Sequence, residues 1–84
     1  MSDSPATKLL FYTTDGCHLC EQAEALLLQL LTADPNRCTV EVIDIIESDD
    51  LVSRYGERIP VVRRADTEQE LGWPFDLAAL RGIL

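Results

Sequence analysis

Cys17 and Cys20 stand three positions apart, where two different sequence patterns meet. Residues 8–13 form an apolar and aromatic run, which is typical of a strand buried on both faces. From Leu19 onward the apolar residues recur every three or four positions, and this spacing predicts an amphipathic helix. A cysteine at the opening turn of a helix is favoured as the reactive thiolate, and a second cysteine one turn later lies within disulfide reach. The chain is therefore expected to hold a dithiol at a strand-to-helix junction.

The motif alone leaves three interpretations open: a dithiol for electron exchange, half of a zinc site, or coincidence. The third cysteine, Cys38, is predicted to open the second strand, so a strand length of about seven residues, or roughly 20 Å, separates it from the pair. Cys38, His18 and the pair therefore cannot share one ion, and we predict no metal site within one chain. Cys38 is expected to be a small half-buried apolar residue. A two-ligand zinc site that bridges two protomers is kept as an alternative.

The length of 84 residues suits one small domain, and no apolar run approaches the roughly 20 residues that a membrane-spanning helix needs. Residues 1–7 contain an acid and no basic cluster, and no export-type apolar stretch follows them. We therefore expect a flexible segment over residues 1–7 and a single domain over residues 8–84. The expected location is the cytoplasm, and the expected form is a monomer.

Acidic residues outnumber basic ones by fifteen to seven, which gives a formal net charge of -8. This charge repels nucleic-acid phosphates and anionic lipid surfaces, so neither is an expected partner. The acidity serves solubility in the simplest interpretation, and the alternative is that it tunes encounters with a basic protein. In a reducing compartment three cysteines argue against a structural disulfide framework, since an odd number leaves one thiol over. Such a compartment would keep the pair reduced until a substrate arrives.

Short elements follow one another along the rest of the chain. Ser48 and Gly56 are typical of the start and the end of a short helix, and Pro60 is acceptable just before a strand. Pro74 is expected at the first position of a last helix, with Asp76 favourable to its dipole. The predicted strands span 8–13, 39–45, 61–64 and 68–71, and the predicted helices span 19–31, 51–55 and 74–83. The order βαβαββα predicts an α/β fold with a four-stranded mixed sheet flanked by helices.

This order of elements resembles the thioredoxin fold, and within it the glutaredoxin-like group, in particular the small bacterial glutaredoxin-like domains. The likeness covers nearly the whole chain. It rests on four stretches, which are Leu10-Phe11-Tyr12-Thr13 with Gly16-Cys17-His18-Leu19-Cys20, Val42-Ile43-Asp44-Ile45, Tyr55-Gly56-Glu57-Arg58-Ile59-Pro60-Val61-Val62, and Leu71-Gly72-Trp73-Pro74-Phe75-Asp76.

The resemblance implies roles for several residues. Cys17 matches the nucleophile of the family and Cys20 the resolving thiol. Pro60 matches a cis-proline whose loop faces the dithiol, and Ile59 would pair with the substrate through its backbone. The alternative for Pro60 is an ordinary trans proline that opens a strand.

Substrate binding is expected to extend to the segment before the last helix. Gly72 stands where the family has paired glycines, and Trp73 follows it. Trp73 either lines a substrate groove beside the cysteines or plugs the small core, and the sequence favours neither.

Three departures from the glutaredoxin pattern bear on glutathione. Thr14 replaces a lysine that contacts a glutathione carboxylate in the family, Gly72 stands alone, and no tyrosine lies between the cysteines. Glutathione is therefore a weaker candidate than in ordinary glutaredoxins, and no tightly bound cofactor is expected. Dithiol exchange itself needs none of these residues.

Two residues are candidates for modulating the dithiol. His18 adjoins the nucleophile, and we expect an exposed side chain that affects Cys17 electrostatically, with an acid-base role as the alternative. Arg58 could supply positive charge to the thiolate or to an acidic substrate, and the alternative is a solvated surface arginine. Acidic residues lie near the pair in sequence, so we predict only a modestly activated thiol.

The sequence thus predicts a thiol-disulfide oxidoreductase of the glutaredoxin-like type. Its partners would be a disulfide-containing protein or a small thiol substrate, together with a reductant, either glutathione or a reductase. A non-catalytic thioredoxin-fold module that binds a protein partner is the alternative.

Overall fold

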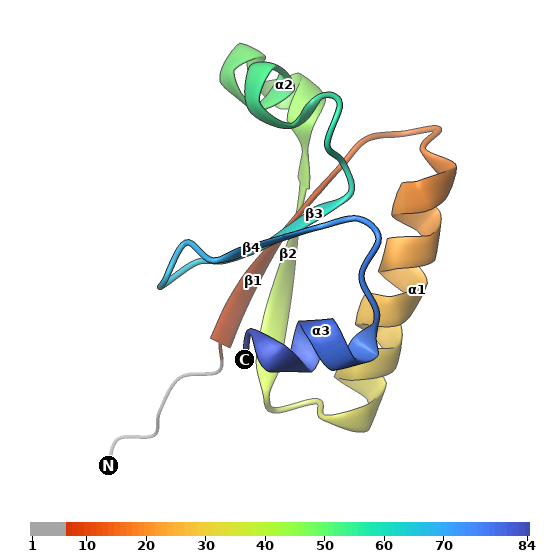
Figure 1. Cartoon of the computed structure of the whole chain (residues 1–84), viewed down its shortest axis with the longest axis vertical. Helices are drawn as coiled ribbons and strands as arrows, with labels where there is room; N and C mark the ends of the chain where they lie inside the picture. Colours follow the sequence, from red (N-terminus) through yellow and green to blue (C-terminus); the bar gives the residue numbers. More distant parts are fainter. Residues whose placement is uncertain (1–6) are drawn as a thin grey trace.

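The computed structural model describes residues 7–84, which form one α/β layer structure (Figure 1). The predicted order βαβαββα is confirmed, with one unpredicted 3-10 turn, η1, after the second strand. The elements are β1 (Thr7–Thr13), α1 (His18–Ala33), β2 (Cys38–Asp44), η1 (Ile45–Glu47), α2 (Asp49–Tyr55), β3 (Val61–Arg64), β4 (Glu70–Gly72) and α3 (Leu77–Gly82). Of the segment expected to be flexible, residues 1–6 lie outside the described residues. Thr7 belongs to β1, so that strand starts one residue earlier than predicted.

The four strands form a mixed sheet in the order β2-β1-β3-β4. β1 runs parallel to β2, which places Thr13 beside Asp44, and antiparallel to β3, which places Tyr12 beside Val61. The carboxyl ends of β1 and β2 and the start of β3 therefore lie at one end of the sheet. The segment that directly follows β1, with the cysteine pair and the start of α1, lies at this end.

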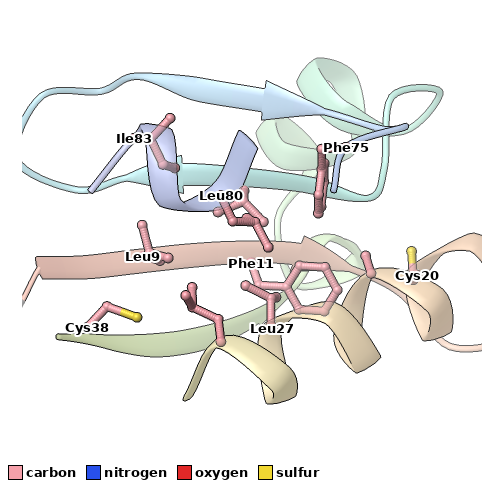
Figure 2. Close-up of a cluster of buried hydrophobic side chains, with 11 residues drawn as sticks. Leu9, Phe11, Cys20, Leu27, Cys38, Phe75, Leu80 and Ile83 are labelled. Carbon is pink, nitrogen blue, oxygen red and sulfur yellow. The ribbon is translucent and has the colours of Figure 1, made fainter. Parts of the chain in front are cut away.

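One face of the sheet carries the main core, beneath α1 and α3, which contact each other (Figures 1 and 2). β1 contributes Leu9 and Phe11, both essentially inaccessible to solvent, as the predicted central strand requires. The buried members of this cluster are Leu9, Phe11, Cys20, Ala23, Leu27, Leu30, Cys38, Val62, Phe75, Leu80 and Ile83. Because Cys20 belongs to this cluster, the first turn of α1 is anchored to the core.

A smaller cluster lies on the other face, where α2 covers one end of the sheet. The rings of Tyr12 and Tyr55 stack there with centroids 4.3 Å apart, and Ile45 and Val61 pack beside them. The Tyr55 hydroxyl donates a hydrogen bond of 2.6 Å to Oε2 of Glu70 on β4. This bond joins α2 to β4, one of the two edge strands of the sheet.

Several features of the elements differ from the sequence prediction. β2 ends at Asp44, whose carboxylate accepts a hydrogen bond from the Ile46 backbone N–H and thereby starts η1. β4 starts at Glu70 and not at 68, because Glu68 adopts a positive φ of 63° in the turn. Gly56 follows α2 with a right-handed φ of -53°, not the left-handed conformation usual after a helix.

The last helix also begins later than predicted. Pro74 precedes α3 and does not occupy its first position, and the Trp73–Pro74 peptide bond is cis. Asp76 is the N-cap, because its carboxylate accepts a hydrogen bond of 2.9 Å from the Ala79 backbone N–H. Asp76 thus stabilises the start of α3 by capping it directly.

Candidate functional site

Cys17 and Cys20 form a disulfide at the start of α1, with their Cα atoms 5.2 Å apart. Gly16 has a φ of +79°, a conformation that glycine adopts without strain, and it turns the chain from the β1 end toward the helix. Cys17 is the N-cap of α1, and its Sγ accepts a hydrogen bond of 3.1 Å from the Cys20 backbone N–H. The sulfur of Cys17 thus lies where backbone N–H groups favour negative charge.

The two sulfurs differ in burial. Cys20 is 3% exposed and belongs to the main core, whereas Cys17 is half-buried and packs against that core from outside. His18, the first helical residue, is exposed. A molecule arriving from solvent therefore meets Cys17 before Cys20.

The loop before β3 lies at the same end of the sheet. The Ile59–Pro60 peptide bond is cis, Pro60 is buried, and Ile59 is half-buried against both hydrophobic clusters. The Trp73 backbone N–H donates a hydrogen bond of 3.2 Å to the Pro60 carbonyl oxygen. The predicted residues of the proline loop and of the segment before α3 are thus joined directly.

Trp73 has features of both roles considered for it, the lining of a substrate groove and the filling of the core. It is half-buried, packs against the main core and meets Phe75 edge-on with ring centroids 5.1 Å apart. Cys17 and Ile59 pack against the same cluster. Gly72 is exposed, and apart from its two chain neighbours no residue has an atom within 4 Å of where a Cβ would stand. The substrate-binding roles of Ile59, Pro60, Gly72 and Trp73 stay predictions.

Arg58 has partners that the sequence did not indicate. Its Nη2 donates a hydrogen bond of 3.2 Å to Oε1 of Glu70, and its guanidinium lies 5.6 Å from the centroid of the Tyr55 ring. The hydrogen bond from Tyr55, followed by the interactions with Arg58, lowers the pKa of the Glu70 carboxyl. Burial and the bond to Glu70 raise the pKa of Tyr55. Arg58 thus belongs to a surface cluster with Tyr55 and Glu70. Its effect on the thiolate stays a prediction.

A pocket of about 290 Å³ adjoins the disulfide on the side of the edge strand β2. Sequence reasoning noted the acids near the cysteines but missed the contribution of β2 to this site. The signal that could have revealed it is the parallel pairing of β1 and β2, since the carboxyl ends of parallel strands meet at one edge. The lining residues are Thr13, Thr14, Asp15, Gly16, Cys17, Cys20, Glu21, Glu24, Val42 and Asp44.

Cys38 lies at the opposite end of β1 from the disulfide, beside Thr7 (Figure 2). It is 1% exposed, more deeply buried than the half-buried residue predicted, and burial raises the pKa of its thiol. Within residues 7–84 no group of three histidine, cysteine or acidic side chains is arranged to hold a metal ion. Among the same residues no helix has the length and apolar character to cross a membrane.

The fold and the cysteine pair define a thioredoxin-fold protein with a Cys-x-x-Cys disulfide. More specifically, the chain belongs to the glutaredoxin-like domain family (DUF836), whose model matches residues 8–84. The family resemblance and the fold predicted from the sequence are both confirmed. No curated protein sequence matches the chain significantly.

Three solved structures illustrate the likeness. A structural-genomics target protein from X. campestris shares 39% identity over 89% of this chain and 92% of its own, with a TM-score of 0.73. A protein from Nitrosomonas europaea shares 29% identity over 100% of this chain and 98% of its own, with a TM-score of 0.79. A mutant thioredoxin from Halobacterium salinarum shares 30% identity over 92% of this chain and 70% of its own, with a TM-score of 0.69.

Proposed function

We propose that this protein is a thiol-disulfide oxidoreductase in which Cys17 is the nucleophile and Cys20 the resolving thiol. The observation that carries the proposal is the pair itself: a disulfide at the start of α1 with one sulfur half-buried and the other enclosed in the core. An enclosed second thiol acts only on a sulfur already bound to its neighbour, which suits resolution better than first attack.

The reaction proceeds in two exchanges. The Cys17 thiolate of the reduced protein attacks one sulfur of a substrate disulfide, forms a mixed disulfide, and releases the other substrate sulfur as a thiolate that takes a proton from water. Cys20 then loses its proton and attacks the Cys17 sulfur, which restores the internal disulfide and releases the second substrate thiolate. The substrate gains two electrons and the protein loses two. A thiol or dithiol reductant, glutathione or a reductase, returns them.

The proposed setting is a reducing cytoplasm, with a disulfide-containing protein or a small thiol compound as substrate and with the chain acting as a monomer. His18 and Arg58 are proposed to modulate the thiolate. The proline loop at Ile59 and Pro60 and the adjacent Gly72 and Trp73 are proposed to hold the substrate backbone.

The test combines turnover and trapping. The reduced protein should reduce a model disulfide, and its Cys20→Ser variant should stop at a stable adduct on Cys17 that mass spectrometry identifies. Cys38→Ala serves as the matched control, because it removes a thiol remote from the pair. Normal thiol titration of Cys17 by alkylation against pH, together with no turnover, would favour the non-catalytic binding module instead.

A further inference from the structure

The pocket beside the disulfide has an unbalanced charge. Both cysteines line it, and all four of its ionisable side chains other than the cysteines are carboxylates, from Asp15, Glu21, Glu24 and Asp44. No ion pair within residues 7–84 involves any of these four acids. Their charge is therefore not compensated by a neighbouring base in the part of the chain that the structure describes.

Some acids elsewhere in the molecule do have a basic partner. Four of the basic residues pair with acids outside the pocket, as Lys8–Glu41, Arg58–Glu70, Arg63–Glu68 and Arg64–Asp66. None of these bases pairs with a pocket acid, so the four carboxylates that line the pocket with the disulfide have no ion-pair partner among residues 7–84. A cleft lined by one sign of charge focuses the field and raises the local concentration of oppositely charged molecules.

The walls of the pocket are also exposed to solvent. One wall belongs to β2, the edge strand, whose Val42 is 57% exposed and offers an apolar contact between the acids. Glu21 and Glu24 are exposed on the first turns of α1. The Asp44 carboxylate is held at the rim by the hydrogen bond from the Ile46 backbone N–H, 3.1 Å long.

We infer that the dithiol acts on disulfides flanked by cationic side chains, namely lysine- or arginine-bearing segments of a protein, in preference to anionic disulfides. This inference rests on the proposed function and names its substrate class. A cationic flank next to the scissile disulfide would lie against the pocket carboxylates while Cys17 attacks. An anionic disulfide, such as oxidised glutathione, would meet the same carboxylates as repulsion.

The test uses two symmetric peptide disulfides that differ only in the residues flanking the cysteine, lysines in one and glutamates in the other. Reduced protein in excess reacts with each peptide in a single turnover, followed by fluorescence dequenching. Each rate constant is divided by that for 2-mercaptoethanol with the same peptide, which corrects for the intrinsic reactivity of the disulfide. The corrected ratio of the lysine to the glutamate peptide is the preference.

The expected preference is about 10- to 100-fold at low ionic strength, the range of electrostatic steering in charged clefts. It should fall to within about 3-fold at roughly 0.5 M salt, where charges are screened over a few ångströms. The combined variant Glu21→Gln, Glu24→Gln and Asp44→Asn should lose at least about 5-fold of the preference at low salt.

A matched control removes three acids near the opposite end of the sheet, by Asp34→Asn, Asp66→Asn and Glu68→Gln. These sites are separated from the disulfide by the length of β1, roughly 20 Å, whereas the pocket acids line the disulfide itself, so the preference should stay within about twofold of the original. The salt series on the unmodified protein tests the inference independently of how well either variant folds.

A preference near one in the unmodified protein, or equal losses in the two variants, would overturn the inference while leaving the exchange reaction in place. If neither peptide reacts faster with the protein than with 2-mercaptoethanol, the proposed function itself fails, and the inference fails with it.

Discussion

Cysteine occupies two contrasting environments at the two ends of β1. At the carboxyl end, Cys17 caps α1 and is half-buried beside an acidic pocket. At the amino end, Cys38 begins β2 within the main core, where burial raises the pKa of its thiol. The difference shows that position in the fold, and not residue type, decides how accessible each cysteine is.

The largest expected effect is a difference in activity between variants at the two ends of β1. Cys17→Ser should lower the rate of disulfide reduction by about 10³-fold or more, because a serine hydroxyl cannot form the mixed disulfide. Cys38→Ala should change that rate by less than about twofold, since Cys38 takes part in neither exchange. Stopped-flow reduction of a model disulfide measures both, and a comparable loss in the two variants would break the comparison.

Alkylation sharpens the same contrast within a single protein. In the fully reduced chain, iodoacetamide should label Cys17 at least about 10³-fold faster than Cys38, because the buried thiol reacts only through an opening of the core. Mass spectrometry of timed samples gives both rates. Rapid labelling of Cys38 in the folded protein would contradict the structure.

The order of elements was predictable because each depends on local patterns. The apolar run before Cys17, the helical stripe after it and the alternation in residues 39–45 are enough for the βαβ unit. The start of α3 was misplaced because Pro74 is compatible with a helix, and only the capping bond of Asp76 to Ala79 reveals the true start.

Contacts between distant residues lay beyond local patterns. The Tyr55–Glu70 hydrogen bond spans 15 positions and the Arg58–Glu70 bond spans 12, and both depend on how β4 lies beside β3. For the same reason Asp44 was expected only as a strand residue, although it also lines the pocket at the disulfide.

The stability of the fold should depend on Cys38, the buried cysteine. Cys38→Ser should lower the free energy of unfolding by about 1–3 kcal/mol, because it buries a hydroxyl in an apolar cluster. Urea unfolding under reducing conditions measures the loss, with Cys38→Ala as the control for the lost volume. A serine variant as stable as the original protein would show that this site is less enclosed than the structure indicates.

The smallest expected effect concerns Glu70, at the start of β4. Because its pKa is lowered in the folded protein, Glu70 stabilises the fold above its ordinary value of 4.5, and this contribution is lost as the pH falls through the lowered value. Glu70→Gln should therefore cost about 0.5–1 kcal/mol near neutrality, a modest figure because the site is partly solvated.

Urea unfolding at pH 7 and about pH 3 checks this sign, since the cost of Glu70→Gln should shrink at the lower pH. Tyr55→Phe is the matched variant, because it removes the principal donor to Glu70 and should reduce the same pH dependence. A cost that grows as the pH falls would be inconsistent with the lowered pKa.

The most direct test is a redox titration of the folded protein across a series of dithiol-to-disulfide buffer ratios, with thiols alkylated and counted by mass spectrometry at each point. The prediction is one reversible two-electron transition confined to Cys17 and Cys20, with Cys38 unlabelled throughout. A pair that stays oxidised until the protein unfolds, or that fails to re-form its bridge, would contradict the account.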